Sequence, residues 1–155
     1  MRMIISQEYI ISVLEALNFP DIFIAALRLS MSNQLGQVIV NGDLTSPFPI
    51  LNGGKQGDPL FPLIYIIACE GLFALLEQHP NYHGIDTPNP DVQFQNSGYA
   101  DDTVLAIGSE SDIDPIETTL RSFEAASGNQ VKPLKSFIIW LGPWKSWYRP
   151  MFDCP

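Results

Sequence analysis

Two neighbouring aspartates, Asp101 and Asp102, are the residues of this sequence that could most directly carry out chemistry. They follow Tyr99 and Ala100, and residues typical of β-strands lie on both sides of the four. Two carboxylates that share a tight turn repel each other unless a cation lies beside them. Mg²⁺ binds proteins through one or two carboxylates together with substrate phosphates, and two such ions can stabilise the entering and leaving oxygens of phosphoryl transfer. The pattern therefore favours a metal site, and an ordinary solvated turn is the alternative, since aspartate is common in turns.

The strands that would position this pair are predicted from short runs of β-branched or alternating residues. Residues 92–95 and 103–107 predict a strand on each side of the acidic turn, and residues 135–141 predict a last strand. Earlier in the chain, residues 37–40 lead into Asn41-Gly42. This pair predicts a hairpin, because a type I′ turn needs two positive φ angles.

Apolar residues that recur at helical spacing predict four helices, at residues 7–17, 21–31, 59–78 and 116–127. Asp58 and Pro59 are predicted to be the N-cap and first residue of the third helix, and Asp114-Pro115 to cap the fourth. Gly128 stands where a glycine would end that last helix. Residues 79–91 are rich in proline and glycine and predict a loop. Helices and antiparallel strands together predict an α+β fold.

The composition predicts a folded but acidic chain. Hydrophobic residues make up 46% and charged residues 16%, which disfavours disorder. Lys and Arg number 8 against 17 Asp and Glu, so the formal net charge is −9. Because clustered Lys and Arg supply most affinity for phosphate backbones, we expect weak or no nucleic-acid binding by this chain alone. The most apolar stretch, residues 60–76, contains Pro62 and Glu70 and predicts a buried helix, with no membrane partner.

Several segments resemble, in order, those of one polymerase family. Tyr99-Ala100-Asp101-Asp102 resembles the Tyr/Phe-Ala-Asp-Asp box of reverse transcriptases. Upstream, residues 54–60 are similar to the family's Gly-Val-Arg-Gln-Gly-Asp-Pro-Leu segment, and Asn41-Gly42 matches the hairpin before it. Downstream, Ser127-Gly128 and Lys135-Ser136 resemble its Ser-Gly-Leu…Asn…Lys-Ser pattern. The polymerases of non-LTR (LINE-like) retrotransposons are the most similar group.

The resemblance implies a polymerase palm, an antiparallel sheet of the ferredoxin-like split βαβ type packed on helices. Residues 1–142 would form an incomplete palm domain, and residues 143–155 an irregular C-terminal tail. The parent activity would be RNA-directed DNA polymerisation by two-metal nucleotidyl transfer. Mg²⁺, or Mn²⁺ in its place, would be the cofactor, and RNA template, DNA primer and dNTP would be the partners. The nucleus or the cytoplasm would be the location.

The resemblance also implies a role for each catalytic candidate. Asp101 would be the principal metal ligand and Asp102 a secondary one. Tyr99 would lie near the primer terminus, and a plain sheet aromatic is the alternative. Lys135 would face the pyrophosphate leaving group, although taken alone it is better interpreted as a solvated lysine.

The glycine-rich segment would bind substrate. Gly54 and Gly57 have no side chain to keep a template or nucleotide away from the backbone, and Gln56 between them could hydrogen-bond that substrate. A plain glycine connector is the alternative.

Departures from the family pattern limit what we expect of the chain. The serine after Pro-Leu is Phe61 here, the loop arginine is replaced by Lys55, and the later asparagine falls near Lys132. Counting back, the family's first catalytic aspartate would lie before Met1, with the fingers upstream and the thumb downstream. We therefore expect the chain alone to be inactive, as a retroelement relic would be. A non-enzymatic acidic interaction module on the palm scaffold, with residues 143–155 as its contact tail, is a further alternative.

Overall fold

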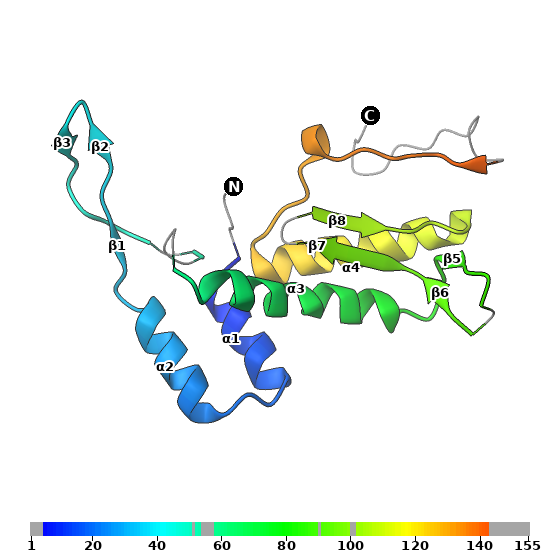
Figure 1. Ribbon diagram of the computed structural model, residues 1–155, viewed down its shortest axis with the longest axis horizontal. Helices are drawn as coiled ribbons and strands as arrows, with labels where there is room; N and C mark the ends of the chain where they lie inside the picture. Colours follow the sequence, from blue (N-terminus) through cyan, green and yellow to red (C-terminus); the bar gives the residue numbers. More distant parts are fainter. Residues whose placement is uncertain (1–4, 51, 54–57, 90, 100–101, 143–155) are drawn as a thin grey trace. The chain divides into compact units, whose positions relative to one another are not determined.

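The computed structural model describes residues 5–50, 52–53, 58–89, 91–99 and 102–142 as helices joined by short antiparallel ladders (Figure 1). The helices are α1 (Gln7–Ala16), α2 (Asp21–Met31), α3 (Phe61–Glu77) and α4 (Ile113–Ser127), with 3₁₀ turns η1 (Glu110–Asp112) and η2 (Pro133–Lys135). The strands are β1 (Leu35–Gly36), β2 (Ile39–Val40), β3 (Asp43–Leu44), β4 (Phe48–Pro49), β5 (Ile85–Asp86), β6 (Gln93–Phe94), β7 (Asn96–Tyr99) and β8 (Asp102–Leu105). They pair as β1–β4, β2–β3, β5–β6 and β7–β8, which confirms the α+β class.

The chain divides into two compact units. The first comprises residues 1–71 with 126–129, and the second comprises residues 72–125 with 130–155. Both α3 and α4 contribute residues to each unit.

The core of the first unit lies among α1, α2 and the first part of α3. Its fully or nearly buried side chains include Ile5, Ile10, Leu14, Ile24, Leu27, Phe61, Ile64 and Ala68. The Ser6 hydroxyl caps α1 by accepting the Tyr9 amide at 3.1 Å. The predicted helices at residues 7–17 and 21–31 are confirmed.

A two-stranded arm follows α2. Asn41 and Gly42 have φ angles of 53° and 92°, as the predicted type I′ turn requires, and they join β2 to β3. Farther from this turn, the strands on either side of the hairpin, β1 and β4, also pair, with Leu35 opposite Pro49. Pro49 is tolerated there because each ladder has only edge strands.

The start of α3 differs from the prediction. The helix begins at Phe61, so Pro59 is not its first residue. Asp58 instead accepts the Leu60 amide at 2.9 Å in a side-chain turn before the helix. The Leu60 carbonyl then accepts the first helical amides, and Pro62 falls in the first turn, where its missing N–H costs nothing.

In the second unit the structure differs from the predictions at the loop, at the start of the fourth helix and at the last strand. The expected loop at residues 79–91 contains β5, which pairs with β6. Helix α4 begins at Ile113, so Asp114 and Pro115 lie in its first turn and do not precede it. The capping box belongs to the preceding 3₁₀ turn η1, with Ser109 as its N-cap and Asp112 as its third residue.

The strand expected at residues 135–141 was wrong. Lys135 and Ser136 donate their amides back to Lys132 and Pro133 in η2, and no strand of the described chain pairs with residues 136–141. The predicted glycine at the end of α4 is confirmed, since Gly128 has φ 73°.

Across the described residues, no helix combines the length and the apolar character that a membrane crossing needs.

A glycine of α3 gives a test of the first unit's packing. A Cβ on Gly71 would lie 2.5 Å from the Tyr9 hydroxyl oxygen, whereas alanine otherwise favours a helix by about 1 kcal/mol. We expect Gly71→Ala to lower the free energy of unfolding in the wild-type chain and to raise it in a Tyr9→Phe background, which lacks that oxygen. Urea unfolding of the four chains measures both effects, and equal effects in the two backgrounds would contradict this packing.

Candidate functional site

Tyr99 and Asp102, the first and last residues of the candidate box, form the last pair of the β7–β8 hairpin. Four residue pairs form the ladder, from Asn96 opposite Leu105 to Tyr99 opposite Asp102. Asp102 is thus a strand residue, whereas residues 100–101, and with them Asp101, lie outside the described residues. A strand precedes and a strand follows these residues, but the first is Asn96–Tyr99 and not the predicted residues 92–95, of which Gln93 and Phe94 form β6 and pair with β5, and the second begins at Asp102. Asp102 is exposed, and Tyr99 is 85% exposed.

Near its tip the hairpin lies on α3. A Cβ on Gly98 would be 2.5 Å from the ring of Phe73, so no other residue fits at position 98 unless that ring moves. The absence of a side chain therefore lets the strand approach the helix closely.

At the opposite end of the hairpin, Tyr82 closes the ladder. The Ala106 amide donates to the Gln95 carbonyl at 2.8 Å, which continues the strand pairing beyond β8. The buried Tyr82 hydroxyl contacts both the Gln95 and the Ala106 carbonyl oxygens, the latter at 3.0 Å. Gln95 returns a side-chain bond to the Tyr82 carbonyl at 2.9 Å. Burial, with a contribution from the Asp112 charge, raises the pKa of Tyr82 to about 12.

A buried carboxylate holds the loops beside this end. Asp112 has no exposed surface and accepts three backbone amides, those of His83 (3.0 Å), Gly108 (2.8 Å) and Ser109 (3.2 Å). The His83 ring nitrogen Nδ1 also lies 3.8 Å from it. The sequence analysis did not single out Asp112. The signal that could have found it is an aspartate three residues after a serine, just before a helix.

The predicted substrate-binding residues Gly54, Gln56 and Gly57 lie outside the described residues. Gly53, just before these residues, is hydrogen-bonded to the N-terminal part of the first unit. The Gly53 amide donates to the Ile5 carbonyl at 2.9 Å, and Gln7 donates to the Gly53 carbonyl at 3.3 Å.

Lys135 is exposed at the end of η2, and within the described part of the chain no ion pair joins it to Asp102. Nor do the described residues include any group of three or more His, Cys, Asp and Glu side chains that could together hold a metal. The structure thus brings Tyr99 and Asp102 together as a cross-strand pair, and it does not join Lys135 to them.

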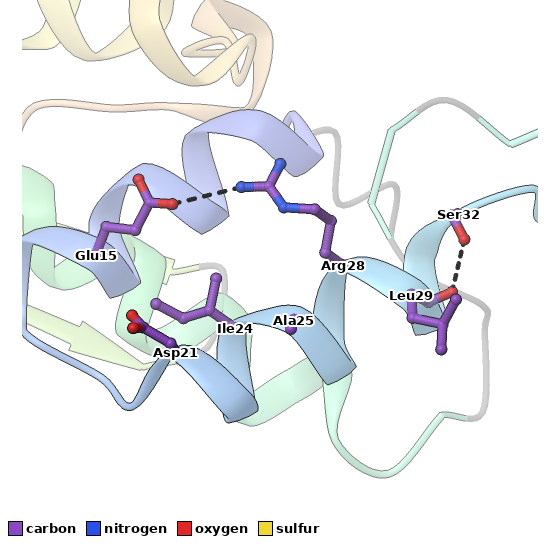
Figure 2. Close-up of a pocket in the computed structure, with 7 residues that line it drawn as sticks. All are labelled: Glu15, Asp21, Ile24, Ala25, Arg28, Leu29 and Ser32. Atoms are coloured by element: carbon purple, nitrogen blue, oxygen red, sulfur yellow. Dashed lines mark hydrogen bonds and ion pairs between the residues drawn. The ribbon is translucent and has the colours of Figure 1, made fainter.

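A hollow beside α1 and α2 contains none of the predicted site residues (Figure 2). Its lining consists of Glu15, Asp21, Ile24, Ala25, Arg28, Leu29 and Ser32. Arg28 donates to Glu15 at 3.4 Å, but both side chains are more than half exposed, so this pair adds little stability. The hollow is therefore not the candidate site.

Comparison with known proteins decides the family. Residues 4–146 match the model of the family described as reverse transcriptase (RNA-dependent DNA polymerase). The chain belongs to this family. The reverse transcriptase domain is also 27% identical over 146 residues to the "Transposon TX1 uncharacterized 149 kDa protein" of Xenopus laevis. That alignment covers 94% of this chain and 11% of the relative, so the chain spans a small part of the relative's length. The family expected from the Tyr-Ala-Asp-Asp box and its neighbours is confirmed.

The contact between Gly98 and Phe73 can be tested by adding one methyl group. Gly98→Ala should lower the free energy of unfolding by about 1–3 kcal/mol, because overpacking forces the ring or the strand to shift. The neighbouring exposed change Ser97→Ala should cost less than about 0.5 kcal/mol. Urea unfolding measures both, and Phe73→Leu should reduce the Gly98→Ala loss. Equal losses at positions 97 and 98 would argue against the close approach.

The raised pKa of Tyr82 predicts an alkaline loss of stability. An unfolded tyrosine ionises near pH 10, whereas the folded Tyr82 keeps its proton until about pH 12. Between these values the unfolded state gains stability by losing a proton, so the free energy of unfolding falls. We expect this fall to be steeper in the wild-type chain than in Tyr82→Phe, measured by denaturant unfolding from about pH 9 to about pH 12. Parallel curves would show that Tyr82 has an ordinary pKa.

Proposed function

We propose that this reverse transcriptase domain carries the aspartate hairpin of a polymerase palm, and that the polymerase copies RNA into DNA by two-metal nucleotidyl transfer. One observation carries the proposal: Tyr99 and Asp102, the first and last residues of the Tyr-Ala-Asp-Asp box, pair across an antiparallel hairpin within the residues that match the family. A tip that exposes Tyr99 and Asp102 is suited to a large substrate, because neither side chain is enclosed.

Asp101 and Asp102 would hold Mg²⁺, or Mn²⁺ in its place. Carboxylate oxygens are the hard donors that both ions prefer, and water and substrate phosphates complete such sites. Within the described chain, no hydrogen bond or ion pair occupies the Asp102 carboxylate, which leaves its oxygens available. When bound, the ions would stabilise the charge that develops on the reacting oxygens.

The other site residues would position the substrates. The large exposed ring of Tyr99 favours a contact beside the primer terminus over a packing role in the sheet. Lys135 would stabilise the pyrophosphate leaving group as a point charge. The backbone at Gly54 and Gly57, with the Gln56 amide, would contact the template or the incoming dNTP.

The fold proposal follows from the same assignment. Residues 1–142 would form one palm domain of the split βαβ type, to which the observed helices and short ladders belong, and residues 143–155 would form its tail. The acidic charge of −9 opposes binding of an RNA template and a DNA primer by this chain alone. We therefore assign most of the affinity for the phosphate backbone of the template and primer to the bound cations and to any basic surface outside this domain.

Metal binding and primer extension test the proposal on the full chain. Mn²⁺ titration followed by electron paramagnetic resonance should show bound ion in the wild type, and Asp102→Asn should weaken it by about tenfold or more. If an RNA template and DNA primer are extended with Mg²⁺, Asp101→Asn should reduce the rate at least about 100-fold.

The matched control is Asp43→Asn. Asp43 is also an exposed aspartate directly after a hairpin turn, but it stands on β3 in the other unit. It should leave both readouts unchanged. Ion binding without extension would support a metal-binding domain that is catalytically inactive alone, and absence of both would reject the proposed function.

A further inference from the structure

Outside its own ladder, the β7–β8 hairpin is held where Gly98 lies on Phe73, where Asn96 donates to Glu77 at 3.3 Å, and at its base. Two-stranded hairpins are at best marginally stable on their own in water. Most residues of both strands are exposed, including Val104 at 56%. The position of the tip must therefore be set by contacts outside the ladder.

Two side chains outside the hairpin make those contacts at its base, and we call Tyr82 and Asp112 together the hairpin anchor. Tyr82 contacts the last carbonyl before β7 and the first carbonyl after β8, so it holds the two strand ends together. Asp112 accepts the amides of Gly108 and Ser109, which directly follow the hairpin. The same carboxylate accepts the His83 amide, and His83 is the neighbour of Tyr82. The two contacts are thus joined through one short loop.

The backbone around the anchor is packed too closely to rearrange easily. A Cβ on Gly108 would overlap the Gly84 carbonyl oxygen, and a Cβ on Gly84 would overlap the Phe94 carbonyl oxygen. Gly84 also has φ 73°, a conformation that other residues rarely adopt. Three backbone segments meet here, and the Asp112 carboxylate accepts amides from two of them.

We propose that the hairpin anchor positions the metal-binding tip, so that Tyr82 and Asp112 are positioning residues for the Asp102 site. The anchor contacts Ala106, which lies four residue steps from Asp102, about 13 Å along a strand, and the cross-strand hydrogen bonds of the ladder transmit the position of the base to Asp102. This inference rests on the proposed role of Asp102 in binding metal.

Asp112→Asn and Tyr82→Phe are the test variants. Asp112→Asn replaces one of the two acceptor oxygens with an NH₂ group, a donor that would face the N–H donors of the backbone. Tyr82→Phe removes only the hydroxyl that contacts the two carbonyl oxygens. Two controls match them within the same unit. Asp91→Asn makes the same chemical change at an exposed aspartate, and Phe123→Leu changes a buried side chain of α4 that takes no part in the hydrogen bonds of the anchor.

Two readouts are taken on the full chain at equal folded fraction. The first is hydrogen exchange of the amides in residues 96–105, which needs no metal. The second is the Mn²⁺ dissociation constant. We expect both test variants to speed exchange as far as Asp102 and to weaken Mn²⁺ binding by up to about tenfold. This is the lower end of the loss that follows removal of a direct partner of a metal ligand, because the anchor acts on Asp102 only through the ladder. Both controls should leave Mn²⁺ binding unchanged, although Phe123→Leu lowers overall stability.

The outcomes separate this inference from the proposed function. Wild-type Mn²⁺ binding that neither test variant weakens would overturn the positioning role while leaving the metal site intact. Equal weakening by Phe123→Leu would also overturn it, because the effect would then be general destabilisation. A wild-type chain that binds no Mn²⁺ would reject the proposed function itself. If Asp112→Asn does not fold, Tyr82→Phe decides alone.

Discussion

The three amide hydrogen bonds to the Asp112 carboxylate are the constraint on which the geometry of the second unit depends. A buried carboxylate is costly unless its oxygens are hydrogen-bonded, and three backbone donors meet that requirement. The same bonds satisfy three amides that irregular loops would otherwise leave unpaired. Together with the Tyr82 hydroxyl, this carboxylate links the loop after α3 to the residues that follow β8.

From this constraint follows the arrangement of the hairpin. Gly84 and Gly108 allow the loops to approach, Tyr82 closes the ladder, and Gly98 lets the distal part rest on Phe73 of α3. The tip is thus held at its base by polar contacts and along its length by one apolar contact. Tyr99 and Asp102 can therefore be exposed and still hold a defined position, because contacts elsewhere in the unit fix the hairpin.

The sequence predicted the local elements better than the contacts that position them. Helices α1 and α2 and the Asn41-Gly42 turn were predictable because periodicity and turn chemistry act over a few residues. The start of α3 was misplaced because the Asp58 side chain forms a turn of its own before the helix begins. The strand at residues 135–141 failed because a strand requires a partner, and no local pattern reports whether one is present.

The candidate site was predictable in a similar, partial way. The Tyr-Ala-Asp-Asp box and its flanking segments identified the family, but the strand before the box was predicted at residues 92–95 and lies at Asn96–Tyr99. The anchor was not predicted, since Tyr82 lay in the expected loop at residues 79–91 and Asp112 was not singled out. Their importance depends on contacts between residues that are between 13 and 29 positions apart in the sequence.

The two described aspartates of this region show why composition alone could not separate structure from function. Asp112 is completely buried, and its charge is compensated by amides of its own chain, so it has no oxygen exposed to a ligand. Asp102 is exposed, and the described residues supply no hydrogen bond or ion pair to its carboxylate, so an external cation can approach it. In a chain with a net charge of −9, a cation at the tip also lowers the repulsion that a nucleic acid would meet there. The buried carboxylate can therefore determine the shape of the unit, while the exposed one remains available for chemistry.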